Sequence, residues 1–218
     1  MPKKRYQGAV NDKERSMQKL IDAVGSIIKT KGYTGLGPTN IAKAAGLSKR
    51  LIYFYFGSVD NLVETYVKGK DYWVAAAGNA GELMEQNKEK HTQEILEALL
   101  LNQLDYFYKE EEMQKIVLWQ ISERTQIMYE VCENRERLGD RFFELADQEL
   151  KGTQVDIRAI AGLLVGGIYH MVLHAKSTDS LFCQIDLNKP EGLERVKSAI
   201  SAILKDTYAQ VKLQQTKA

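Results

Sequence analysis

The sequence has little cysteine, little proline and no long run of apolar residues. Its two cysteines, Cys132 and Cys183, lie far apart and form no CxxC pair, which argues against a disulfide scaffold or a zinc ribbon. With only three prolines, long stretches lack helix breakers, and the apolar residues recur at helical spacing. We therefore expect an all-α protein in a reducing, cytoplasmic compartment, with both thiols buried as small hydrophobes.

The longest stretch without a formal charge covers residues 159–175 and contains two histidines and three glycines. It is shorter than the roughly 20 residues that a helix needs to cross a bilayer. We expect a buried protein helix here rather than a membrane span. The basic amino end is followed by no apolar segment, so we also expect no secretory signal.

Motifs of catalysis are missing too. The sequence contains no P-loop, no GxSxG and no GxGxxG. His170 and His174 have the i, i+4 spacing that can bind zinc, but a closed structural site needs four ligands and no third is evident. Packing or interface hydrogen bonds are the favoured role for these histidines. We expect no enzyme activity, no metal and no other cofactor.

Charge is distributed unevenly along the chain, although the formal net charge is only +1. The first 70 residues hold thirteen basic and five acidic residues, a net +8, so the remainder carries −7. A basic first third on an acidic body favours contact with a polyanion such as nucleic acid. Chance clustering on a solvated surface gives the same count. The basic tail is expected either to reach the DNA or to be a solvated arm; it consists of Lys3, Lys4 and Arg5.

A helix-turn-helix unit is predicted next. Apolar residues at helical spacing over 17–28 predict a first helix. A short helix over 40–45, opened by Thr39 as N-cap or first-turn residue, ends at Gly46, which permits a tight turn. A third helix follows over 49–56. The small core of this unit is expected to contain Ile41, Ala42, Ala45, Leu47 and Ile52.

The third helix of this unit is predicted to read DNA. In a helix-turn-helix protein this helix enters the major groove, and its first residues reach base edges. Lys49 or Arg50 can bind guanine O6 and N7, and Leu51 can meet a thymine methyl group. The residues expected to contact DNA are Thr39, Ser48, Lys49, Arg50, Leu51, Tyr53, Tyr55 and Gly57.

Four consecutive aromatic residues occupy 53–56. One interpretation alternates them: Tyr53 and Tyr55 face the DNA, whereas Phe54 and Phe56 face inward and anchor the helix. The other interpretation is a hydrophobic helix end with surface tyrosines, because helical spacing usually indicates core.

The segment GYTGLGPTNIAKAAGLSKRLIYFYFGSVDNLV, 32–63, resembles the DNA-binding segment of TetR-type (TetR/AcrR) transcriptional regulators. That pattern runs Gly-Tyr/Phe, a short loop, Ile-Ala-x-x-Ala-Gly-Val-Ser, then a short helix ending Tyr-x-x-Phe. The motif covers about the first 65 residues, and the remainder matches by its all-helical architecture of about six helices. The matching residues are Ile41, Ala42, Ala45, Gly46, Leu47, Ser48, Tyr53 and Phe56.

The sequence departs from that pattern at a few positions. Tyr55 stands where histidine is common and can still donate to phosphate, whereas Val59 replaces a phosphate-binding lysine and cannot. In a variant branch that lacks this lysine, backbone N–H groups at 57–60 hold the phosphate. Gly37 and Pro38 replace the usual hydroxyl cap, so Thr39 or the backbone is expected to take that role.

The resemblance implies two domains: a helix-turn-helix DNA-binding domain over 1–57 and a larger helical ligand-binding and dimerisation domain over 58–218. Such regulators form homodimers through their last two long helices, here about 155–176 and 190–211. A helix that is apolar on all sides must be covered on all sides, and its glycines permit close approach. The residues expected at the dimer interface are Gly162, Gly166, Ile200 and Leu204.

A small-molecule effector bound by the body is also implied. An apolar pocket with a few polar tips selects an apolar or amphipathic ligand. For each candidate the alternative is core packing, because aromatic residues at helical spacing usually belong to a core. The candidate lining residues are Tyr106, Phe107, Trp119, Met128, Cys132, Phe143 and Tyr169.

The expected function is that of a ligand-responsive dimeric transcriptional regulator, a repressor, that binds a palindromic double-stranded operator in the major groove. A two-fold dimer places its reading helices about 34–36 Å apart, one turn of the duplex. The effector would release the operator. The alternative is an all-helical small-molecule-binding protein or enzyme with an incidental helix-turn-helix.

Overall fold

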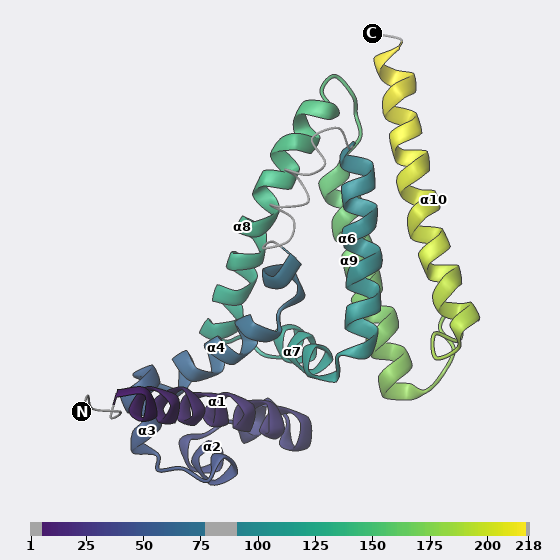
Figure 1. Ribbon diagram of the computed structural model, residues 1–218. Coiled ribbons are helices and arrows are strands. Elements are labelled where there is room, and N and C mark those ends of the chain that lie inside the picture. The colour runs from purple at the N-terminus through teal and green to yellow at the C-terminus, as the bar shows by residue number, and fades with distance from the viewer. Residues whose placement is uncertain (1–5, 77–90, 217–218) are drawn as a thin grey trace. The chain divides into compact units, whose positions relative to one another are not determined.

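A computed structural model describes residues 6–76 and 91–216, with side-chain environments from residue 12 onward. Over these residues the regular structure is helical, apart from an isolated bridge between Phe182 and Ile185 (Figure 1). The predicted fold class is therefore confirmed: an N-terminal helix-turn-helix precedes a larger helical body. The described residues form two compact units, the first within 1–71 and 111–132, the second within 72–110 and 133–218.

These units divide the chain differently from the predicted domains. The fourth helix and a later segment pack with the helix-turn-helix, so the compact first unit extends past residue 57 and includes 111–132. These units describe which helices pack together, and they do not show which residues bind DNA or ligand. The predicted functional division into 1–57 and 58–218 stays a prediction.

The first unit is built from the helix-turn-helix and the helices that pack on it. A 3-10 turn, Tyr33–Gly35, links the first two helices. The helices are α1 (Tyr6–Lys31), α2 (Pro38–Ala45), α3 (Arg50–Phe56), α4 (Val59–Lys70), α7 (Glu111–Ser122) and the beginning of α8 (Gln126–Glu149).

Local chemistry sets the ends of α2. Pro38 occupies its first position, where a missing N–H has no consequence, and Gly37 is the N-cap without a side-chain hydrogen bond. Thr39 lies in the first turn, so its alternative role as N-cap is wrong. At the other end Gly46 adopts φ 65° and ψ 32°, and the Leu47 N–H donates to the Ala42 carbonyl at 3.0 Å. This Schellman turn is the predicted tight turn between α2 and α3.

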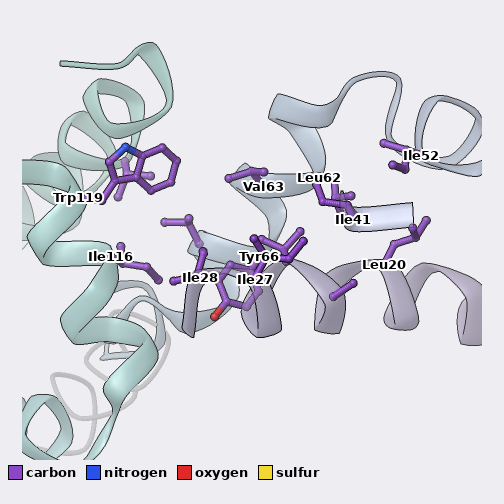
Figure 2. Packing of buried hydrophobic residues seen from close by; sticks show 14 of the residues in the cluster. Leu20, Ile27, Ile28, Ile41, Ile52, Leu62, Val63, Tyr66, Ile116 and Trp119 are labelled. Atoms are coloured by element: carbon purple, nitrogen blue, oxygen red, sulfur yellow. The ribbon is translucent and has the colours of Figure 1, made fainter. Parts of the chain in front are cut away.

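Buried hydrophobic side chains from α1, α2, α3, α4, α7 and α8 meet in the first unit, and Figure 2 shows most of them. The predicted core of the helix-turn-helix is confirmed: Ile41, Ala42 and Ile52 are buried, and Ala45 and Leu47 pack against them. Further buried members come from α1, α4, α7 and α8. Among them are Leu20, Val24, Ile27, Ile28, Leu62, Val63, Tyr66, Val67 and Ile116.

Two predicted pocket residues belong to this same core. Trp119 is buried and stacks on Tyr33, with ring centroids 5.4 Å apart and an interplanar angle of 2°. Met128 is buried in the same cluster, while Cys132 is half-buried. Trp119 and Met128 thus pack in the core of the first unit, and their predicted role in lining an effector pocket stays a prediction.

The second unit holds the remaining helices. Figure 1 shows α6 beside α9, and α6 also packs on α10. Asp156 caps α9 by accepting a hydrogen bond from the Ala159 N–H at 3.0 Å. The helices are α6 (Thr92–Lys109), the rest of α8, α9 (Ile157–Thr178) and α10 (Pro190–Gln215).

A buried polar network fixes the start of α6 in this unit. The Glu149 carboxylate accepts hydrogen bonds from the Thr92 N–H at 2.8 Å and from the Thr92 hydroxyl at 2.7 Å. The Thr92 and Tyr208 hydroxyl oxygens lie 2.6 Å apart. Because the network joins α6, α8 and α10, it sets the register of the bundle.

Helix α9 is long and apolar enough to span a membrane by length and composition alone, yet only 22% of its most apolar stretch is buried within the chain. Gly162, Gly166 and Leu163 are exposed on it. On α10, in contrast, Ile200 and Leu204 are buried in the single chain. These two residues therefore support the core and do not lie on the exposed face that a partner would meet.

His170 and His174 pack around Phe182, with ring centroids at 4.8 and 5.3 Å from that ring. His174 Nε2 also lies 2.9 Å from the Ser180 hydroxyl. Among the described residues, no group of three or more His, Cys, Asp or Glu side chains is placed to hold a metal. Cys183 is exposed, which corrects the prediction that both thiols are buried.

Candidate DNA interface

The exposed face of α3 is formed by Arg50, Tyr53 and Phe54. These residues stand at i, i+3 and i+4, so they lie on one side of the helix with the arginine one turn before the two rings. Tyr53 is 51% exposed and Phe54 is 77% exposed. Ile52, on the opposite side, is fully buried in the core of the first unit. The core thus holds α3 so that a guanidinium and two aromatic rings face outward.

Phe54 was expected to face inward, and this expectation is wrong. Alternation of inward and outward residues has a period of two, whereas a helix turns by 100° per residue. Phe56 does pack against the core, and so does Tyr55, which is half-buried. The Phe54 ring meets the Tyr55 ring edge-on at 5.2 Å. Phe54 is therefore an outward residue that sequence reasoning missed, and helical spacing from Arg50 was the available signal.

The other predicted DNA contacts divide into exposed and packed residues. Ser48 and Lys49 are exposed at the start of α3, and Thr39 is exposed on α2. The Ser48 hydroxyl oxygen accepts a long hydrogen bond from the Arg50 backbone nitrogen at 3.4 Å, and the N-cap of α3 is Lys49. Leu51 packs against the core of the first unit. The tail residues Lys3, Lys4 and Arg5 lie outside the described residues.

The start of α4 follows α3 after a single turn. Ser58 is the N-cap, and its hydroxyl accepts a hydrogen bond from the Asn61 N–H at 3.0 Å. The Gly57 N–H already donates to the Tyr53 carbonyl at 3.0 Å. The predicted phosphate contact through the Gly57 N–H therefore has no support, and the N–H groups that open α4 remain the predicted donors.

An ion-pair cluster joins α1, α4 and α7 within the first unit. The Glu112 carboxylate pairs with the ammonium groups of Lys29 at 2.6 Å and Lys70 at 2.7 Å. Burial opposes ionisation of Glu112, but hydrogen bonds from Lys29, Lys70 and Tyr66 outweigh it and hold the pKa of Glu112 at about 2. The same pairing raises the pKa of Lys29. No local sequence signal predicts this cluster, because its members come from three separate helices.

Candidate effector-contacting residues are found in the second unit. The Phe107 and Tyr169 rings meet edge-on at 4.8 Å, and the Trp73 indole N–H donates to the Tyr169 hydroxyl at 3.0 Å. Tyr72 donates its hydroxyl hydrogen to the Leu99 carbonyl at 2.8 Å, and its ring centroid lies 5.6 Å from that of Tyr106. Burial and the nearby Tyr169 raise the pKa of Tyr72 to about 12, which keeps it neutral.

The fourth predicted pocket residue of this unit has a different environment. Phe143 on α8 is half-buried, and the Arg158 guanidinium lies 4.8 Å from its ring centroid. Arg158 also forms a bidentate ion pair with Asp147. The structure therefore brings together Tyr106, Phe107 and Tyr169 through shared aromatic neighbours, while Phe143 takes part in a cation–π contact.

We compared the sequence and the fold of this chain with those of known proteins. Residues 20–66 match the family model of bacterial regulatory proteins, tetR family. No curated protein matches the chain significantly. The matched segment runs from α1 through α4 and therefore includes the whole outward face of α3.

Solved structures share the fold of the chain. The transcriptional regulator FadR from Bacillus subtilis, solved in complex with stearoyl-CoA, is 20% identical with a TM-score of 0.61, over 86% of this chain and 96% of that one. FadR from Bacillus halodurans is also 20% identical with a TM-score of 0.61, over 85% and 94%. A TetR family regulator from Marinobacter aquaeolei is 17% identical with a TM-score of 0.63, over 88% and 96%.

The family match and the shared fold agree with the motif found in the sequence. Residues 20–66 carry the N-terminal segment of the tetR family, the rest of the chain folds as solved TetR-family regulators do, and the predicted resemblance to TetR-type transcriptional regulators is confirmed.

Proposed function

We propose that this chain is a dimeric, ligand-responsive transcriptional repressor whose α3 reads an operator in the major groove. The observation that carries the proposal is the outward face of α3, on which Arg50 stands one turn before Tyr53 and Phe54 while the opposite side is fixed by the core. The match of residues 20–66 to the tetR family supports it.

Each residue of this face has a distinct chemical role in the proposal. Arg50 binds the O6 and N7 atoms of a guanine, a bidentate contact worth about 1–3 kcal/mol of discrimination. The Phe54 ring packs on the methyl group of a neighbouring thymine, and the Tyr53 hydroxyl binds a phosphate. Lys49 and Ser48, at the start of the helix, bind phosphate groups of the DNA backbone. Base contacts thus select the sequence, and phosphate contacts fix the position.

The exposed apolar face of α9 supports a second copy as partner. Leu163 is 77% exposed, and the glycines at 162, 166 and 167 beside it leave a smooth surface. On α10 the exposed Ile203 and Leu213 add apolar area. An apolar face of this extent on a helix is stable in water only when it is covered. We propose that the same two helices of a second copy cover it, which also pairs the two reading helices.

An apolar or amphipathic effector is proposed to act through the second unit. The B. subtilis regulator of the same fold was solved with stearoyl-CoA, a ligand with a long apolar chain. An effector releases the operator only if it binds the non-DNA-binding state more tightly than the DNA-binding state. The aromatic cluster around Phe107 and Tyr169 is the proposed contact region.

Fluorescence anisotropy with duplexes from the region upstream of the chain's own gene tests the proposal. We expect affinity for one duplex to fall steeply as salt rises, because counterions are released on binding. Arg50→Ala should reduce the affinity for that duplex at least about tenfold and affect random DNA little. The control Lys205→Ala, at an exposed position of α10, should change neither. Binding that ignores salt, or an equal loss on both duplexes, contradicts the proposal.

A further inference from the structure

Gln103 lies in the middle of α6 and is fully buried. Neither its amide oxygen nor its amide nitrogen has a hydrogen-bond partner within the parts of the chain that the structure describes, 6–76 and 91–216. A buried polar group left without a partner destabilises the folded state, and leucine at this position would avoid that penalty. Within the described residues the amide therefore only destabilises the fold, unless a bound molecule supplies its hydrogen-bond partner.

The residues on the same face of α6 are apolar or aromatic. Leu99 and Leu100 lie one turn before Gln103, and Tyr106 and Phe107 lie one turn after it. Tyr72 connects both turns, because its hydroxyl donates to the Leu99 carbonyl and its ring lies against Tyr106. The amide is thus set into the aromatic cluster that the sequence selected as a candidate effector site.

The hydroxyl groups of Tyr72 and Tyr169 already have hydrogen-bond partners within the chain. Tyr72 donates to the Leu99 carbonyl, and Tyr169 accepts from the Trp73 indole. No residue of the cluster carries a formal charge. A charged ligand group would be costly to bury there, whereas a neutral group that can accept a hydrogen bond would match the amide N–H of Gln103.

We propose that Gln103 recognises the neutral carbonyl of an acyl effector, whose apolar chain lies against the aromatic residues of α6 and α9. The inference rests on the proposed function, since it names the chemical group by which the effector is recognised. An acyl carbonyl, as in a thioester, accepts from the amide N–H and adds no charge to the site. The rest of the selectivity then comes from apolar contact with Phe107 and Tyr169.

A buried water that satisfies Gln103 is the competing explanation. In that case the amide would be a structural group, and the affinity for an acyl ligand would not depend on it. The two explanations differ in one measurable respect, which is the response of Gln103 variants to the presence of a carbonyl in the ligand.

Isothermal titration calorimetry distinguishes the two explanations. It measures the affinity of the full-length protein for stearoyl-CoA and for the thioether analogue S-octadecyl-CoA. The two compounds differ only in the carbonyl oxygen. We expect the wild type to prefer the thioester about tenfold, and Gln103→Leu to bind both compounds with the same reduced affinity. Gln114→Leu applies the same change to a buried glutamine of the first unit and should keep the preference.

Three results overturn the inference: an unchanged thioester preference in Gln103→Leu, equal affinity of the wild type for both compounds, or no binding of either. Operator binding without ligand gives a separate readout, in which wild type and Gln103→Leu should be equal. If neither protein bound any operator, the proposed regulatory function would fail while the acyl site remained supported by the titration.

Discussion

Tyr66 on α4 and Glu112 on α7 are joined by a hydrogen bond of 2.8 Å, in which the tyrosine hydroxyl donates to the carboxylate. The same carboxylate pairs with Lys29 of α1 and Lys70 of α4. One acidic side chain thus connects three helices of the first unit, two of which, α1 and α4, overlap the segment 20–66 that matches the tetR family. The stability of the first unit should therefore depend on the Glu112 carboxylate.

Glu112→Gln should lower the free energy of unfolding by about 2 kcal/mol at neutral pH, because the variant loses the charge that pairs with two lysines. In the wild type the pKa of Glu112 is about 2, below its ordinary value of 4.5. The contribution is therefore present above pH 4.5 and is lost as the pH falls from 4.5 towards 2. Urea unfolding at a series of pH values measures it.

The neighbouring Glu111→Gln is the matched control, since Glu111 is exposed on the same turn of α7. It should leave both the stability and its pH dependence close to wild type. If the two variants unfolded alike at every pH, the ion-pair cluster would have no special part in holding the unit together.

Phe54→Ala should weaken operator binding about three- to tenfold, because it removes an apolar contact with a thymine methyl group. Replacing that thymine by uracil, which lacks only the methyl group, should weaken the wild type by a similar factor. The two changes together should cost little more than either alone, as expected for partners in one contact. Fluorescence anisotropy with the four protein–duplex combinations measures this coupling.

Ile121→Ala is the control for this cycle, because Ile121 is 67% exposed in the same unit but lies on α7. It should not change the response to uracil at any position. Additive losses for Phe54→Ala and every thymine-to-uracil change would exclude a methyl contact by Phe54.

Leu163→Asp should convert the dimer into a monomer by placing a charge in the middle of the proposed interface. The matched control is Leu181→Asp, at a position that is 59% exposed in the loop after α9. Sedimentation velocity at micromolar concentration reports the mass of each variant. A wild-type monomer, or an undiminished dimer in Leu163→Asp, would show that α9 is not the pairing surface.

Much of the helix-turn-helix could be predicted from the sequence because nearby residues determine its turn and its short helices. Gly46 with Ala42 and Ile41 specifies a tight turn between two short helices, and the structure has that turn. The outward direction of Phe54 could also have been obtained from the same local information. It required the helical period counted from Arg50 rather than alternation along the aromatic run.

Other features depend on packing between distant segments and have no local signal. Trp119 lies in an amphipathic helix whose apolar face fits either unit, and only tertiary contact decides that it stacks on Tyr33. Burial of Ile200 and Leu204 likewise follows from the neighbours that α10 finds in the single chain. Gln103 occupies a position of α6 where the spacing of Leu96, Leu100 and Phe107 calls for an apolar residue, and this exception was a usable signal.

Selection of binding sites from a pool of random duplexes by the purified protein tests the reading role of α3 most directly. We expect an inverted repeat with a guanine in each half, half-site centres separated by one or more helical turns of about 10–10.5 base pairs, and loss of the guanine preference in Arg50→Ala. Absence of any enriched sequence, or an enriched site whose guanines are selected equally by Arg50→Ala, would contradict it.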